Sequence, residues 1–429
     1  NHGYPAYDEQ GLFYWAYGGD LKGYDRYNDN NFCMDGLITP DQQYMPHVYI
    51  VKKVYQNILF EADDLSKGLI RVINDFKFTD ISTDEYSFKW ILLKNGEKSA
   101  EGDFELNLKA DSKANIQLNL SNIQWQKGFE YYLQIFAYTK KSDVFIPAGF
   151  EVAKEEFLFD KNNYFVNVDN GIGSFEQEEG RKNQVTIRVG EISYEFLKRG
   201  SSALMNIYDS GKPLLKEAPQ LNFWRAPTDN DFGEKAHHKS LIWKAVGQTL
   251  QYSLEKTEEK DGMMKLYYQA ESPGVNMIIN LVYSINAEGS LTTSVHYRAL
   301  SKNLPELFRF GITIVLPQEF NNFVWYGRGP HENYIDRNAD TFMGIWSGKV
   351  NEQFFPYYRP QETGNKTDVR WLILKNDSGE GIRINGVQPL SVSALPYRTE
   401  DMDPGLTKKQ QHSSDLMPRK ETILSVDLF

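Results

Sequence analysis

The sequence predicts a mainly β protein with one clear helix. Over much of the chain, apolar and polar residues alternate, which is the period of a half-buried strand. Aromatic residues make up 14% of the 429 residues, including 26 Tyr and 26 Phe. Such side chains suit all-β cores and also surfaces that stack on sugars. The length predicts two or three domains, because a single hydrophobic core stops growing at roughly 250 to 300 residues.

The first region, residues 1–58, reads as a loop followed by a helix. Its first part is rich in Gly, Asp and Asn and shows little periodicity. After a proline, which a first helical turn tolerates, apolar residues recur at helical spacing, as at Val48, Val51 and Val54. We expect residues 45–58 to be the longest helix of the chain. This is how a (β/α) barrel would finish, although an irregular N-terminal arm would read the same way.

The second region, residues 59–157, changes to the period of strands. Residues 86–93 alternate and lead to Asn95-Gly96, the dipeptide favoured in two-residue hairpin turns. Residues 129–138 read as another strand. About a hundred residues of such strands, without cysteines, suggest an immunoglobulin-like sandwich.

The third region, residues 158–429, continues this pattern on a larger scale. Strand-like runs occur at residues 185–189, 277–283, 291–297 and 381–384. Because helical runs are few over some 270 residues, we expect a large two-sheet sandwich here.

Composition excludes several classes of function. The formal charge is −11 and no basic run interrupts the acidic background, so nucleic acid is not an expected partner. No stretch approaches 18 apolar residues, so we expect no membrane partner. The one cysteine, Cys33, allows neither an intrachain disulfide nor a cysteine-based zinc site, and it leaves the compartment undecided. The chain starts at Asn1 within a loop-like stretch, which is what we expect of an excised piece.

The densest polar tract runs from residue 224 to residue 231. Its carboxylates, Asp229 and Asp231, could be mistaken for the catalytic pair of a glycosidase. Ion pairing of both with Arg225 is the commoner use of such a triplet, and we expect Arg225 to be at least partly buried and paired with one or both of them. A polar loop follows, which we expect to be mobile from Gly233 onward. In that loop His237 and its neighbour His238 are predicted to be a solvated pair rather than a metal site, because adjacent residues rarely converge on one ion.

A second tract spans residues 325–334 and is followed by polar segments at 356–365 and 368–371. Its glycines lack the spacing and the following helix of a dinucleotide site. His331 and Glu332 could serve proton transfer. A buried polar network that supports the sandwich is the interpretation we favour.

Together these two tracts resemble the C-terminal region of the large β-galactosidases of glycoside hydrolase family 2. The resemblance covers essentially the whole chain. It implies the last loop and helix of a (β/α)8 catalytic barrel at residues 1–58 and an immunoglobulin-like sandwich at 59–157. For residues 158–429 it implies a large terminal sandwich of the galactose-mutarotase type.

The resemblance also implies an activity for a larger parent enzyme. That activity is retaining hydrolysis of terminal β-D-galactosides such as lactose, by an enzyme expected to be a homo-oligomer. In the family both catalytic glutamates lie on earlier barrel strands, and no glutamate here has a matching context. We therefore expect this chain alone to be inactive and to supply part of the sugar subsite, a covering loop and assembly surface.

A cation site is implied at residues 28–37. In the family, the position of Phe32 gives a backbone carbonyl, and that of Asp35 a side-chain oxygen, to a sodium ion at the galactose subsite. Familiar members carry Asn in place of Asp35, and an Arg in place of Asn30 that helps to order the loop. Without the resemblance, this stretch would be read as Asx turns rather than as a calcium loop. Sodium, with magnesium elsewhere in the parent, is the implied cofactor, and none should bind firmly to this chain alone.

A rival hypothesis is a stand-alone carbohydrate-binding or mutarotase-like module, in which the sandwich itself meets sugar. A natural module should not begin partway through a barrel loop and carry a lone helix. The start of the chain therefore favours the β-galactosidase interpretation.

Overall fold

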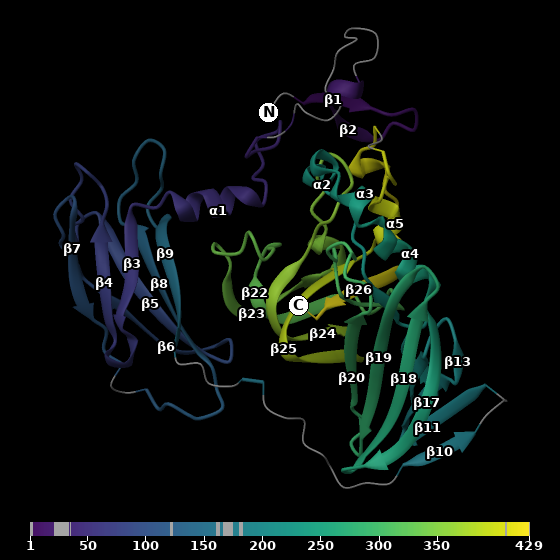
Figure 1. The fold of residues 1–429 in the computed structure, drawn as a ribbon. Helices are drawn as coiled ribbons and strands as arrows, with labels where there is room; N and C mark the ends of the chain where they lie inside the picture. The colour runs from purple at the N-terminus through teal and green to yellow at the C-terminus, as the bar shows by residue number, and fades with distance from the viewer. Residues whose placement is uncertain are drawn as a thin grey trace.

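The structure, a computed structural model, describes residues 3–20, 34, 36–120, 123–159, 164–165, 175–179, 183–407 and 410–428. It is mainly β, as predicted, and its strands form several separate sheets. Figure 1 shows a sandwich built from β3 to β9 beside a larger body built from β10 to β26, with helix α1 running toward the smaller sandwich. Within the described ranges, no helix is long and apolar enough to cross a membrane.

The N-terminal region holds a hairpin, a 3-10 turn and one helix. These are β1 (Tyr4–Tyr7), β2 (Phe13–Ala16), η1 (Gly18–Asp20) and α1 (His47–Val54). The expectation that residues 45–58 form the longest helix is wrong, because α4 (Leu241–Thr249) has nine residues and α1 has eight. Helix α1 ends early because Ile58 starts strand β3, where its side chain is buried in the core of the next sandwich.

The smaller sandwich is immunoglobulin-like, with seven strands in two sheets. One sheet has the order β3 (Ile58–Asp64), β4 (Leu69–Asn74), β7 (Ser112–Gln117). The other has the order β6 (Glu97–Phe104), β5 (Tyr86–Lys94), β8 (Tyr131–Thr139), β9 (Glu151–Phe159). Alternate residues of these strands, such as Phe88, Trp90 and Leu92 on β5, face a common core.

The hairpin turn predicted at Asn95-Gly96 is present. Both residues have positive φ, 49° and 85°, as a type I′ turn requires. The Asn95 amide donates to the Glu130 carbonyl at 2.9 Å. A Cβ on Gly96 would lie 2.6 Å from ring carbons of Tyr326, which belongs to the larger body. The turn therefore also forms part of the contact between the two sandwiches.

The larger body contains three hydrogen-bonded sheets rather than the two expected. The first is β10 (Glu176–Glu179), β11 (Gln184–Val189), β12 (Ile192–Leu197), β14 (Leu204–Asp209), β15 (Lys212–Pro213). The second is β13 (Arg199–Gly200), β17 (Gln251–Lys260), β18 (Met263–Ser272), β19 (Val275–Asn286), β20 (Leu291–Ala299). The third is β16 (Gln220–Asn222), β21 (Gly311–Pro317), β26 (Glu421–Asp427), β25 (Gly381–Leu395), β24 (Lys366–Lys375), β22 (Asn322–Gly329), β23 (Phe342–Lys349).

Two hydrophobic cores hold these three sheets. The first and second sheets share one core, into which α4 inserts Trp243 and Val246. The third sheet builds a second core around Phe323 and Trp325.

A buried ion pair joins the two sandwiches. Glu130, which precedes β8, receives two hydrogen bonds of 3.0 Å from the guanidinium of Arg370 on β24. The Tyr326 hydroxyl donates to the same carboxylate at 2.5 Å, and Arg370 also donates to the Tyr132 hydroxyl at 3.0 Å. Leu93, Tyr132, Tyr326 and Met343 form a small apolar cluster around this pair. The contact is therefore apolar, with its buried charges paired.

Gly96→Ala should weaken this contact more than its backbone conformation alone explains. Positive φ in a residue with a Cβ costs roughly 1 to 2 kcal/mol, and forcing a methyl group against the Tyr326 ring adds about 1 to 3 kcal/mol. Gly128→Ala is a matched control, since its φ is also 85° but a Cβ there meets nothing within 4 Å. Urea unfolding should show the larger loss for Gly96→Ala. Equal losses would mean that the turn does not support the contact.

Candidate functional site

The tract from Trp224 to Asp231 leaves the edge of the third sheet at β16. The Asn222 side chain accepts from the Trp224 amide at 3.0 Å and so turns the chain at the strand end. The buried indole stacks on Phe308 with ring centroids 4.9 Å apart, and its Nε1 donates to Asp403 at 2.8 Å. Strand β16 and the segment around Asp403 therefore fix the start of the tract.

Arg225 and Asp231 form a two-point ion pair. Their Nη1–Oδ2 and Nη2–Oδ1 distances are 2.5 and 3.0 Å, and the guanidinium lies 4.8 Å from the centroid of the Phe308 ring. Thr228 caps the helix that follows, because it and Asp231 exchange side-chain and backbone hydrogen bonds. Burial acts to raise the pKa of Asp231, but the Arg225 and Thr228 donors outweigh it and hold that pKa below its usual value.

Of the two carboxylates expected near Arg225, Asp231 pairs with it, and Asp229 binds another arginine. Its Oδ1 accepts from Nε of Arg359 at 3.0 Å, a residue 130 positions further along the chain. The Arg359 side chain is 1% exposed, and its guanidinium lies 4.8 Å from the centroid of the Phe232 ring. Each carboxylate of the tract is thus bound by its own arginine. This arrangement suits a scaffold better than a catalytic pair.

The mobile loop expected from Gly233 onward is helical in the structure. Gly233 lies in α2 (Asp229–Glu234), which is followed by α3 (Ala236–Lys239) and then by α4. The prediction was wrong because glycine and charged residues favour a loop locally, whereas the Thr228 cap starts a helix. Lys235 then turns the chain with a φ of 57° between the two short helices.

His237 is buried, which also corrects the prediction of a solvated pair. Its side chain is 2% exposed, whereas His238 is exposed. The two ring nitrogens of His237 lie 3.0 Å from the Asp231 carbonyl and 3.1 Å from the Leu406 carbonyl. The imidazole therefore links α2 to the C-terminal segment. A histidine in a polar stretch has no sequence pattern that predicts such a contact.

The N-terminal region contacts the larger body close to this tract. Nε2 of His412 lies 2.8 Å from Asp20, and the imidazole packs at a tilt against the rings of Tyr14 and Tyr17, with centroids 4.2 and 5.1 Å away. The buried Tyr17 hydroxyl donates to the Gln411 carbonyl at 2.6 Å. No local pattern in the sequence points to His412 as a partner of this region. These contacts position the end of the first region against the larger body.

The second polar tract forms a closed network, as favoured from the sequence. The Glu332 carboxylate accepts from Arg337 at 2.6 Å, from the Thr363 hydroxyl at 2.9 Å, from the Gly364 amide at 2.7 Å, and from the Tyr357 hydroxyl. Four donors occupy this buried group, which leaves it poorly placed for proton transfer with a substrate. Its neighbour His331 lies 2.6 Å from Asp340, and its ring stacks on Tyr49 of α1 at 4.4 Å.

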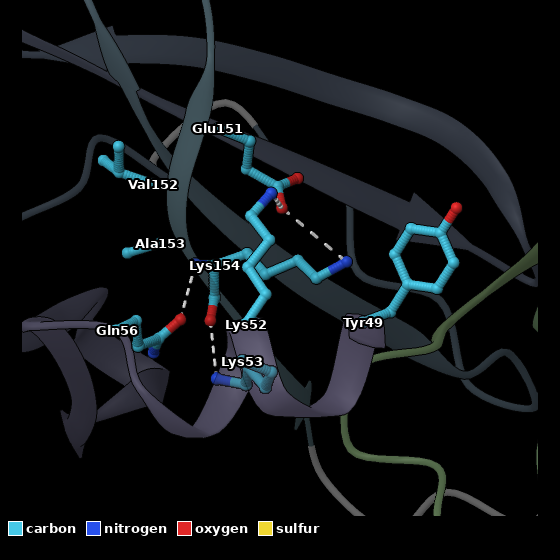
Figure 2. Close-up of a pocket in the computed structure, with 8 residues that line it drawn as sticks. All are labelled: Tyr49, Lys52, Lys53, Gln56, Glu151, Val152, Ala153 and Lys154. Atoms are coloured by element: carbon cyan, nitrogen blue, oxygen red, sulfur yellow. Dashed lines mark hydrogen bonds and ion pairs between the residues drawn. The ribbon is translucent and has the colours of Figure 1, made fainter. Parts of the chain in front are cut away.

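Figure 2 shows a small cavity between α1 and β9. Two of the lysines that line it share the Glu151 carboxylate. Nζ of Lys52 lies 3.0 Å, and Nζ of Lys154 3.8 Å, from Glu151. Lys53 and Gln56 bond the carbonyl and the amide of Lys154 at 2.6 and 3.1 Å. The cavity volume is about 30 Å³, which holds a water molecule but not a sugar ring.

The predicted sodium ligands, Phe32 and Asp35, lie outside the described residues. Met34 between them is described, and its side chain is buried. Within the part of the chain that the structure describes, no group of three or more His, Cys, Asp or Glu side chains could hold a metal ion.

Both polar tracts lie within a part of the chain that matches a known protein family. Residues 189–429, more than half of the chain, match the family described as β-galactosidase small chain. The chain belongs to this family. Residues 70–160 match β-galactosidase domain 4, and residues 3–60 match the TIM-barrel domain of the family 2 glycosyl hydrolases.

Three curated relatives are each longer than this chain. The β-galactosidase of Priestia megaterium is 32% identical over 92% of this chain and 38% of its own length. That of Halalkalibacterium halodurans is 28% identical, also over 92% of this chain and 38% of its own length. The β-galactosidase of Psychromonas ingrahamii is 27% identical over 100% of this chain and 41% of its own length. The chain thus spans about two fifths of the β-galactosidases that it matches.

Similarity to solved structures is weaker. A candidate aldose 1-epimerase from Escherichia coli K12 aligns with 56% of this chain and 97% of its own, at 10% identity and a TM-score of 0.26. That score is too low to assign the larger body to a fold family.

Replacing Arg225 by Ala should destabilise the tract because it leaves Asp231 without its charged partner. The pair is partly exposed, with side-chain exposures of 24% and 11%, so we expect a loss of about 1 to 3 kcal/mol, below the cost of breaking a fully buried pair. Arg225→Lys, which keeps the charge but not the two-point geometry, should lose less. Urea unfolding measures both, with Arg188→Ala on the exposed face of β11 as control. A loss for Arg225→Ala no larger than the control's would contradict the scaffold role.

Proposed function

We propose that this chain is the C-terminal part of a retaining β-galactosidase that hydrolyses terminal β-D-galactosides such as lactose. The observation that carries the proposal is the match of residues 189–429 to the β-galactosidase small chain, together with relatives that are β-galactosidases over nine tenths of the chain. The match of residues 3–60 to the TIM-barrel domain supports an origin of the first region in a catalytic barrel.

In this proposal the chain supports the chemistry and does not perform it. A retaining glycosidase needs an acid/base carboxyl and a nucleophilic carboxylate about 5 to 5.5 Å apart across the sugar bond. Asp229 and Asp231 are each bound by an arginine, and Glu332 is enclosed by four donors. Such carboxylates are held as charged hydrogen-bond acceptors, which suits a scaffold that positions the edge of a sugar site.

We propose that the short helices α2 and α3 cover the mouth of the sugar site in the parent, in place of the loop predicted from sequence. Three contacts support this role by fixing their position: the Arg225–Asp231 pair, the Asp229–Arg359 pair and the His237 bridge to Leu406. The same end of the larger body receives the first region through His412 and Asp20. A barrel that continued from that region would bring its open end close to α2.

We also propose that Phe32 and Asp35 supply oxygen ligands to a sodium ion in the parent enzyme. A backbone carbonyl and a carboxylate are suitable donors for a hard cation. Two ligands from one short stretch leave most of the coordination shell to other groups, so firm binding would require the rest of the barrel. Homo-oligomerisation of the parent through the larger body belongs to the same proposal.

The isolated chain should therefore hydrolyse no aryl β-galactoside, because the candidate carboxylates among the described residues, Asp229, Asp231 and Glu332, are all bound by other groups of the chain. It should also leave the mutarotation of α-D-galactose, followed by polarimetry, at the uncatalysed rate. Exchange of Na⁺ for K⁺ at constant ionic strength should not move its unfolding midpoint.

Galactoside turnover above that of a mock preparation would contradict the proposal that this chain supports the chemistry without performing it. Accelerated mutarotation that is lost in His331→Ala would instead favour the mutarotase-like module. A midpoint raised by Na⁺ in the native chain, but not in Asp35→Ala, would mean that the cation site is complete without the rest of the barrel.

A further inference from the structure

Among the described residues at the contact between the two sandwiches, one cluster of charged side chains has one more carboxylate than arginines. We call Glu130, Glu156, Asp368, Arg328 and Arg370 the interface charge cluster. Three carboxylates face two guanidinium groups, so the cluster has a net charge of −1 if every member is ionised. Burying an uncompensated charge is costly, and a group in this position can instead take up a proton.

Hydrogen bonds identify the carboxyl that receives no hydrogen bond from a charged donor. Glu130 receives two bonds of 3.0 Å from Arg370, and Asp368 receives one of 2.6 Å from Nε of Arg328. Glu156 lies 3.6 Å from Nη1 of Arg328, and that nitrogen already donates to the Thr341 carbonyl at 2.7 Å. Glu156 is thus the member without a direct charged donor.

The donors that do reach Glu156 are neutral and cross the contact. Its Oε2 accepts from Nε2 of Gln134 on β8 and from the Met343 amide on β23, both at 2.8 Å. Gln134 in turn donates to the Met343 carbonyl at 2.8 Å. Glu156 and Gln134 from the smaller sandwich therefore bind both backbone groups of Met343 in the larger body.

Other charged groups nearby do not neutralise Glu156. Lys154, two residues earlier on β9, has its Nζ 3.8 Å from Glu151 and 4.9 Å from the centroid of the Phe342 ring. On β24, the Asp368 carboxylate adds negative charge. The Glu156 side chain is 5% exposed, against 35% for Asp368, so solvent screens the charge of Glu156 less than that of Asp368.

We propose that Glu156 makes the contact between the immunoglobulin-like sandwich and the larger body responsive to pH near neutrality. With a proton on Glu156 the cluster is neutral, and β23 is held against β8 and β9. Loss of that proton leaves a buried negative charge at the contact and loosens β23.

The protonation behaviour agrees with this geometry. Burial raises the pKa of Glu156 from 4.5 to about 7, and it outweighs the lowering by the Arg328 charge and by the two neutral donors. Because the folded-state pKa is the higher one, the contribution of Glu156 to the contact is fully present below about pH 4.5. It is lost as the pH rises through about 7.

Hydrogen exchange of the Met343 amide in the full chain tests the proposal. Between pH 5.5 and 8.5, its protection relative to the intrinsic exchange rate should fall at least about tenfold. Glu156→Gln, which carries no titrating group, should show no such fall. Glu97→Gln on the exposed hairpin of the same sandwich is the matched control and should behave like the native chain.

A second variant keeps the test decisive if Glu156→Gln does not fold. Asp368→Asn leaves Arg328 free to compensate Glu156, so the fall in protection should move to lower pH. Asn is tolerated at this position, where φ is 55°. Equal pH dependence in the native chain and Glu156→Gln, or an unchanged midpoint in Asp368→Asn, would overturn the proposal.

Discussion

The buried pair between Glu130 and Arg370 is the interaction on which the arrangement of the two sandwiches depends. It connects residues 240 positions apart and is completed by the hydroxyls of Tyr326 and Tyr132. Removing one partner of such a pair leaves an uncompensated charge in an apolar surrounding, which is far more costly than losing an exposed pair. The Asn95-Gly96 turn and the hydrogen bond from the Met343 amide to Glu156 both rely on this contact staying closed.

The scaffold proposed for the sugar site depends on the same arrangement. Helix α1 lies at the end of the first region and is bound to β9 by Lys52 and Lys53, while His331 of the larger body stacks on Tyr49 of the same helix. The first region also meets the larger body through Asp20 and His412. It is thus held at two places, and each arginine-bound carboxylate near α2 keeps its position relative to the barrel tail.

Local chemistry was predictable from the sequence, whereas partners distant in the chain were not. Alternation predicted β5, and the Asn95-Gly96 turn follows from two adjacent residues that tolerate positive φ. The ion pair of Arg225 with Asp231, six residues apart, was expected on the same local basis. The partner of Asp229 was not predictable because Arg359 lies 130 positions further along the chain. The helical state of Gly233 was missed because the Thr228 cap outweighs the helix-breaking tendency of one glycine.

A double-mutant cycle on Glu130→Gln and Arg370→Met tests most directly whether this pair holds the two sandwiches together. Free energies of unfolding in urea at neutral pH should fall by about 3 to 5 kcal/mol for each single variant. The double variant should lose less than the sum of the two, with a coupling energy of at least about 2 kcal/mol. Losses that add to within about 0.5 kcal/mol would contradict the account, because residues that depend on one another for charge compensation cannot act independently.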